Sequence, residues 1–71
     1  MNTKNNLLIS VIIPVYNSED TIGPLVGKLL AELSPSFETE IILVNDNSKD
    51  QSDKVCCELH EQFGGRVKYY L

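Results

Sequence analysis

Two polar clusters hold the side chains of this 71-residue chain that are best suited to binding chemistry. In residues 14–20 (PVYNSED), Tyr16 offers a flat ring that could stack on a base while its hydroxyl stays in water. In residues 45–50 (NDNSKD), the ionised carboxylate of Asp46 can only accept hydrogen bonds, so it could bind the imide N–H of a uracil ring. The polar residues after Asp46 could contact a ribose or close the turn.

Each of these residues also has a purely structural explanation. Asp46 and Asp50 suit a turn and a helix cap, and Pro14 suits the end of a strand. Tyr16 taken alone suits a partly buried ring. What favours binding is that both clusters follow predicted strands, because ligands of open parallel sheets bind outside the carboxyl ends of the strands.

The segments around the clusters predict an α/β fold, a parallel sheet unit with the order β-α-β-α-β. Runs of β-branched and other apolar residues predict strands over residues 7–15, 40–44 and 67–71. The first two runs are almost continuously apolar, which is typical of parallel strands covered on both faces. Pro14 cannot donate a ladder hydrogen bond, so pairing of the first strand is expected to stop there.

Helices are predicted between the strands, over residues 22–33 and 51–63, from apolar residues spaced three and four apart. Pro35 follows the first helix, and Gly64-Gly65 follows the second. Residues 1–6 are polar and are expected to form a flexible tail. The expected caps lie at the helix starts: Thr21 or Gly23 for the first helix, and Asp50 or Ser52 for the second.

Composition and charge exclude several classes of protein. The 71 residues form one domain at most, and 42% hydrophobic with 23% charged residues indicates a folded rather than a disordered chain. A net charge of −4 argues against a nucleic-acid partner. No apolar run approaches the roughly 20 residues of a membrane-spanning helix, and no export signal is recognisable, so we expect a cytoplasmic location.

The cysteines and the single histidine give little indication of a metal or a nucleophile. Cys56 and Cys57 are adjacent on a predicted helix, so their side chains point about 100° apart and cannot bridge each other easily. One of them is expected to pack in the core and His60 to face solvent. Neither a glycine-rich dinucleotide turn nor a P-loop occurs in the chain.

Residues 10–17 (SVIIPVYN) and 40–52 (EIILVNDNSKDQS) together resemble the opening of the family 2 glycosyltransferases. That opening is a strand ending in Pro-x-Tyr-Asn, a helix, and a strand ending in Val-Asp-Asp-x-Ser-x-Asp-x-(Ser/Thr). The resemblance extends over residues 7–71. It implies the nucleotide-binding front of a GT-A (Rossmann-like) fold, a nucleotide-sugar donor that is UDP-linked, and inverting transfer with a divalent metal, Mg or Mn. By matching position, it implies these nucleotide-binding residues: Pro14, Val15, Tyr16, Asn17, Asn45, Asp46 and Ser48.

The chain departs from the family pattern in ways that matter for catalysis. Asn45 stands where the family often has its first aspartate, and Ser18 separates Glu19 from the Pro-x-Tyr-Asn motif, which leaves Glu19 without an implied role. The metal-binding Asp-x-Asp motif and the catalytic base of the family lie beyond the third strand, and the 71 residues contain no Asp-x-Asp. We therefore expect a truncated domain with no catalytic or metal-binding residue of its own, inactive alone, from a parent enzyme that is itself able to attach to a membrane.

Two other interpretations remain open at this point. The chain could be a non-catalytic α/β binding or self-association module, a homo-oligomer held together by its exposed sheet edge and apolar surface. It could also be a small flavodoxin-like or receiver-like domain. A receiver needs an acidic cluster after the first strand, where this chain has residues 14–17 (PVYN) instead.

Overall fold

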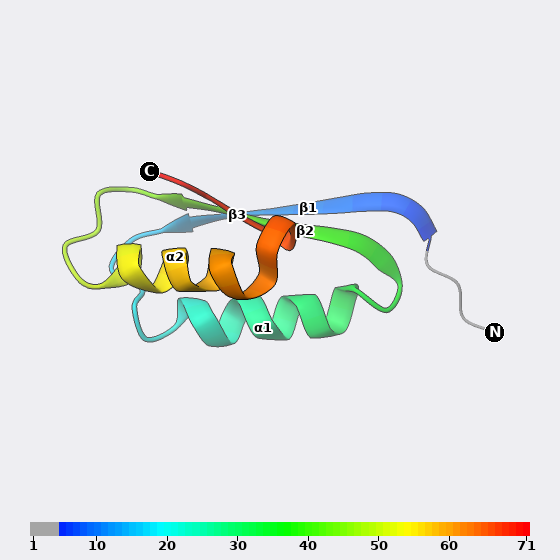
Figure 1. Ribbon diagram of the computed structural model, residues 1–71, viewed down its shortest axis with the longest axis horizontal. Coiled ribbons are helices and arrows are strands. Elements are labelled where there is room, and N and C mark those ends of the chain that lie inside the picture. The colour runs from blue at the N-terminus through cyan, green and yellow to red at the C-terminus, as the bar shows by residue number, and fades with distance from the viewer. Residues whose placement is uncertain (1–4) are drawn as a thin grey trace.

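A computed structural model describes residues 5–71 and confirms the alternating order of strands and helices. The first two strands extend farther than their apolar runs, whereas the third ends at Tyr70, one residue short of the predicted bound. Asn5 and Asn6, expected in a flexible tail, belong to the first strand, and the rest of that tail lies outside the described residues. The elements are β1 (Asn5–Val15), α1 (Ile22–Leu33), β2 (Phe37–Asn45), α2 (Ser52–Phe63), the 3-10 turn η1 (Gly64–Arg66) and β3 (Val67–Tyr70) (Figure 1).

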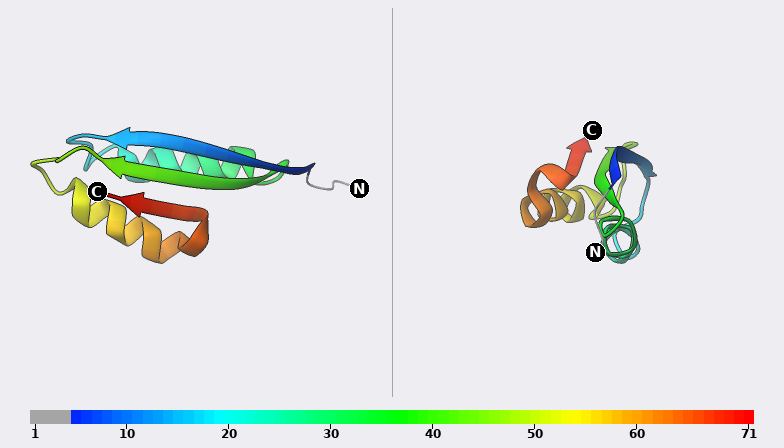
Figure 2. Two further views of the ribbon diagram at one scale, coloured as in Figure 1. Left: turned by 90° about the horizontal axis from the view of Figure 1, so that it is seen from above. Right: turned by 90° about the vertical axis from the view of Figure 1, so that its right-hand side faces the viewer.

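The three strands form one parallel sheet in the order β1-β2-β3, which Figure 2 shows from above. Pairing of β1 with β2 continues through Pro14 opposite Val44 to Val15 opposite Asn45, one step past the predicted stop. The missing N–H of Pro14 does not end the ladder because β1 is an edge strand. The register therefore brings β1 and β2 to an end at the same level.

Both helices cover the same face of the sheet (Figure 1). Right-handed crossovers that step in one direction from strand to strand place their helices on one side. The prediction that both faces are covered is wrong for this chain. The face away from the helices, called here the open face, exposes Leu8, Ile12, Val44 and Tyr70, and Ile12 is 66% exposed.

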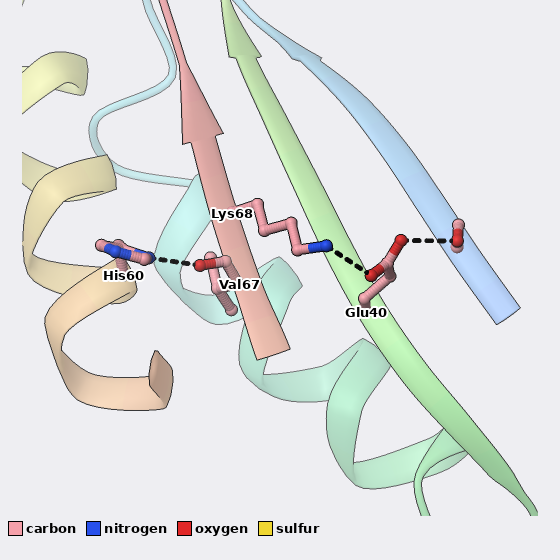
Figure 3. Close-up of polar contacts among 5 residues, drawn as sticks. Glu40, His60, Val67 and Lys68 are labelled. Atoms are coloured by element: carbon pink, nitrogen blue, oxygen red, sulfur yellow. Dashed lines mark hydrogen bonds and ion pairs between the residues drawn. The ribbon is translucent and has the colours of Figure 1, made fainter. Parts of the chain in front are cut away.

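Three polar side chains cross the middle of the open face. Ser10 Oγ donates to Glu40 Oε1 at 2.8 Å, and Lys68 Nζ lies 3.1 Å from Glu40 Oε2 (Figure 3). The hydrogen bond from Ser10, followed by that from Lys68, lowers the pKa of Glu40, and the bond with Glu40 raises the pKa of Lys68. The carboxylate and the ammonium thus offset each other's charge on this face at neutral pH.

The core lies between the covered face of the sheet and the two helices. One residue per turn of α1 is buried, while Leu25 is 42% exposed, so the buried stripe of this helix is narrow. Cys56 is buried as expected of one cysteine, and desolvation raises the pKa of its thiol to about 11. The buried apolar residues are Val15, Ile22, Val26, Leu30, Ile41, Leu43, Cys56, Leu59 and Val67.

The N-cap residues of the two helices agree with the predictions only in part. Thr21, one of the two predicted residues, is the N-cap of α1, although its side chain makes no capping hydrogen bond. The N-cap of α2 is Gln51, which corrects the prediction of Asp50 or Ser52. Asp50 still satisfies the helix start, because its Oδ1 accepts the backbone N–H of Ser52 at 2.9 Å.

Candidate functional site

The strand-end loops, residues 16–21 after β1 and 46–51 after β2, lie against each other at the carboxyl ends of the strands. Their starting points are joined by the backbone, because the N–H of Asp46 donates to the carbonyl oxygen of Val15 at 2.9 Å. The two polar clusters singled out in the sequence therefore form one surface. This is the arrangement expected of neighbouring parallel strands.

Asn17 ties the first loop to the second through two hydrogen bonds. Its backbone N–H donates to Ser48 Oγ at 3.0 Å, and its Oδ1 accepts the N–H of Lys49 at 2.8 Å. Asn17 has φ 45° and Asn47 has φ 54°, so an asparagine occupies the left-handed region in each loop. Asparagine tolerates this region better than most residues, which explains its use in both turns.

A second pair of hydrogen bonds joins the first loop to the start of α2. The N–H of Ser18 donates to Ser52 Oγ at 2.7 Å, and the N–H of Glu19 donates to Asp50 Oδ2 at 3.1 Å. Desolvation, the largest single influence on Asp50, acts to raise its pKa, but the hydrogen bonds from Ser52 and Glu19 together lower it. Asp50 and Ser52 are therefore occupied in holding the loops together.

The predicted site residues differ in how exposed their side chains are and in whether those side chains form hydrogen bonds within the loops. Tyr16 is 57% exposed, and Pro14 and Asp46 are exposed as well, so their side chains are accessible to a ligand. The side chain of Val15 is fully buried in the core, which leaves only its backbone at the loops. The remaining predicted residues hold the loops through hydrogen bonds: Asn17, Asn45 and Ser48.

Asn45, which is itself buried, is the centre of a hydrogen-bond network that sequence reasoning missed. It is 6% exposed; its Oδ1 accepts from the Ser48 N–H at 3.1 Å and its Nδ2 donates to Tyr69 Oη at 2.9 Å. Tyr69 Oη in turn donates to Asp53 Oδ1 at 2.6 Å. Desolvation, followed by the bond to Asp53, raises the pKa of Tyr69 to about 12. The signal in the sequence was the alternation of side chains along a strand. Tyr69 lies two residues after Val67, so a buried Val67 places Tyr69 on the face that the helices cover.

The residues present do not fit a metal site. Within residues 5–71, no group of three or more His, Cys, Asp or Glu side chains could hold a metal ion. His60 lies on the surface with its Nδ1 2.5 Å from the carbonyl oxygen of Val67 (Figure 3), while Cys56 is buried in the core. No step of a reaction is therefore assigned to a metal held by these residues.

A groove elsewhere on the molecule involves none of the predicted site residues. It has a volume of about 680 Å³ and is lined by residues that include Leu30, Phe63 and Arg66, where the two helices end. Arg66 Nη2 donates to Ser34 Oγ at 2.6 Å on its rim. The strand-end loops therefore remain the candidate site.

The fold and the paired loops define a class: a truncated α/β, Rossmann-like unit of the GT-A type. Comparison with known families agrees, because the model of the family described as "Glycosyl transferase family 2" matches residues 10–71. The chain belongs to this family. Neither helix within residues 5–71 has the length and apolar character that crossing a bilayer requires.

Individual relatives cover most of this chain but are much longer. It is 38% identical over 60 residues to an undecaprenyl-phosphate 4-deoxy-4-formamido-L-arabinose transferase of Edwardsiella ictaluri, a match to 83% of this chain and 18% of that protein. It is 39% identical over 61 residues to a dolichol-phosphate mannosyltransferase of Saccharomyces cerevisiae, a match to 82% of this chain and 23% of that protein. The chain thus spans less than a quarter of the length of either relative.

Proposed function

We propose that this chain is the nucleoside-binding front of a glycosyltransferase that transfers a sugar from a UDP-linked donor to an acceptor. The observation that supports the proposal is that some side chains at the strand ends are exposed, while others hold the loops together by hydrogen bonds. Tyr16 and Asp46 are exposed on two loops that are joined by one hydrogen bond donated and one accepted by Asn17. An aromatic ring and a carboxylate held on a rigid support suit a flat base that carries an N–H donor.

The side chains have separate roles in this proposal. The ring of Tyr16 stacks on the uracil, Asp46 accepts its imide N–H, and Pro14 lines the edge of the pocket. Asn17, Asn45 and Ser48 contribute by holding the loops rather than by touching the ligand.

The surroundings of the site indicate that it binds the nucleoside rather than the diphosphate. Carboxylates lie before both helices, at Glu19, Asp20 and Asp50, and in the first turn of α2, at Asp53, and they outnumber the cations Lys49 and Lys54. In the complete enzyme, we propose that an oxygen of an acceptor hydroxyl or phosphate attacks the anomeric carbon, the bond from that carbon to the diphosphate oxygen breaks so that UDP leaves, and a carboxylate takes the proton of a hydroxyl acceptor. The residues for the divalent metal and the base would lie outside these 71 residues.

A titration of the labelled chain with UDP tests the proposal. At millimolar UDP, we expect the amide signals of Tyr16 and Asp46 to shift in two-dimensional NMR spectra. Asp46→Ala should weaken binding about tenfold or more, because a hydrogen bond to a charged acceptor is lost. Glu58→Ala, which removes an exposed carboxylate from α2, is the matched control and should bind like the original chain.

Two results of this titration would count against the proposal. If no signal shifts at millimolar UDP, the loops of this chain do not form a nucleoside site. If GDP, titrated in parallel, shifts the same signals at lower concentration than UDP, the donor is not UDP-linked.

The open face favours a second candidate function, self-association with another copy of this chain. Ile12, Val44 and Tyr70 are exposed there, and on the same face Glu40 and Lys68 offset each other's charge. Apolar area with an internally paired ion pair can be buried against an identical surface without leaving a lone charge in the interface. This candidate does not involve the strand-end loops, so both functions can be tested separately.

Light scattering coupled to size-exclusion chromatography measures self-association directly. We expect a species larger than a monomer. Ile12→Ser should weaken it about tenfold or more, because burial of an isoleucine side chain contributes about 1.5–3 kcal/mol. Leu25→Ser, at an exposed position on α1, is the control and should leave the assembly unchanged. A monomer over the whole concentration range would rule this function out.

A further inference from the structure

A continuous chain of hydrogen bonds connects the first strand-end loop to α2. The N–H of Asn17 donates to Ser48 Oγ at 3.0 Å, and Ser48 Oγ donates to Asn45 Oδ1 at 2.6 Å. Asn45 Nδ2 donates to Tyr69 Oη at 2.9 Å, and Tyr69 Oη donates to Asp53 Oδ1 at 2.6 Å. The links come from both loops, from the end of β2, from β3 and from α2.

The chemistry of its members fixes the direction of this chain. The backbone N–H of Ser48 can only donate, so the side-chain atom of Asn45 that faces it at 3.1 Å must be the oxygen. The amide nitrogen of Asn45 must then face Tyr69. Because the Tyr69 oxygen accepts that bond, its own proton is free for Asp53, whose carboxylate can only accept.

We propose that Tyr69 and Asp53 are positioning residues of the nucleoside site, which fix the orientation of the Asn45 amide and thereby hold the turn that carries Asp46. The inference rests on the proposed function for its consequence in ligand binding. Asn45 is almost completely buried, so an unpaired amide there would be costly and the turn would have to shift to satisfy it. The Tyr69 hydroxyl keeps its proton at neutral pH, because its pKa, raised to about 12, lies far above that range.

The proposal accounts for asparagine at position 45 in this chain. An aspartate there would have no N–H to donate to Tyr69, and two carboxylates, at positions 45 and 53, would compete for one hydroxyl proton. Asparagine at position 45 is therefore matched to the carboxylate of Asp53. If position 53 were an amide instead, the same chain could run in the opposite direction toward a carboxylate at position 45.

The test exchanges the amide and the carboxylate between positions 45 and 53 in the full chain. Asn45→Asp is expected to speed hydrogen exchange of the Ser48 amide about tenfold and to weaken UDP binding by a similar factor, because one buried partner is lost. Adding Asp53→Asn to Asn45→Asp should return the exchange rate of the Ser48 amide and the affinity for UDP to near the values of the original chain. Tyr69→Phe should resemble Asn45→Asp, whereas Tyr70→Phe, at the exposed neighbouring position, is the matched control.

Urea unfolding of every variant separates loop positioning from global stability, and comparisons are made where each variant is fully folded. The proposal is overturned if Asn45→Asp and Tyr69→Phe leave the Ser48 amide and UDP binding unchanged, or if Asp53→Asn fails to rescue Asn45→Asp. If the original chain does not bind UDP, the proposed function fails, and the exchange rate of Ser48 still decides whether Tyr69 and Asp53 position the turn.

Discussion

Replacing Ile41 with alanine is expected to lower the free energy of unfolding by about 2–5 kcal/mol. Ile41 is fully buried in the central strand, where it lies opposite Val11 of β1 and Val67 of β3. A chain of this length has roughly 4–11 kcal/mol of stability in total, so the loss removes a large share of it. Urea unfolding followed by circular dichroism measures the change.

Ile12→Ala is the matched control, because the same side chain is removed from a strand position that is 66% exposed. We expect it to change the free energy of unfolding by less than about 1 kcal/mol, since little buried surface is lost. At a concentration where the chain is monomeric, equal losses for Ile12→Ala and Ile41→Ala would contradict the open face, because they would show that the chain itself covers Ile12.

Replacing Gly64 with alanine is expected to destabilise the chain by about 1–3 kcal/mol through backbone strain. Gly64 follows α2 with φ 62° and ψ −136°, a conformation that is essentially restricted to glycine. A Cβ built at this position meets no atom within 4 Å, so the cost comes from the backbone and not from a clash. Thermal unfolding should show a midpoint about 4–8 °C lower for each kcal/mol lost.

Gly65→Ala provides the comparison one residue further along. A Cβ at Gly65 also meets no atom within 4 Å, but Gly65 does not have a positive φ. We expect it to leave the melting temperature unchanged or to raise it slightly, because alanine restricts the unfolded chain. A loss as large as that of Gly64→Ala would show that flexibility of the whole turn, rather than the conformation of Gly64, is what the fold requires.

Much of the fold could be predicted from the sequence because its signals are local. The spacing of Ile22, Val26 and Leu30 identifies the buried side of α1, and Gly64 marks the end of α2. The meeting of the two strand-end loops also followed, since parallel neighbouring strands end on the same edge of a sheet. Each of these inferences needed only nearby residues and a general rule.

What the sequence could not indicate depends on contacts between distant elements. The apolar run of β1 looks the same whether Ile12 faces a helix or water, and the answer depends on the direction in which the crossovers step across the sheet. The role of Asn45 depends in the same way on Tyr69 and Asp53, which lie on two other elements. The start of α2 also involves a distant segment, because Asp50 accepts the N–H of Ser52 there and the N–H of Glu19 from the first loop.

The order β1-β2-β3 in space repeats the order of the strands in the chain, and this has a consequence for synthesis on the ribosome. By the time Asn45 has left the exit tunnel, both strands of the first parallel pair and the helix between them are available to fold. Nothing in that pair has to wait for a strand made later, because β3 is added at the far edge of β2. Vectorial assembly from the N-terminus is therefore compatible with every strand contact in the unit.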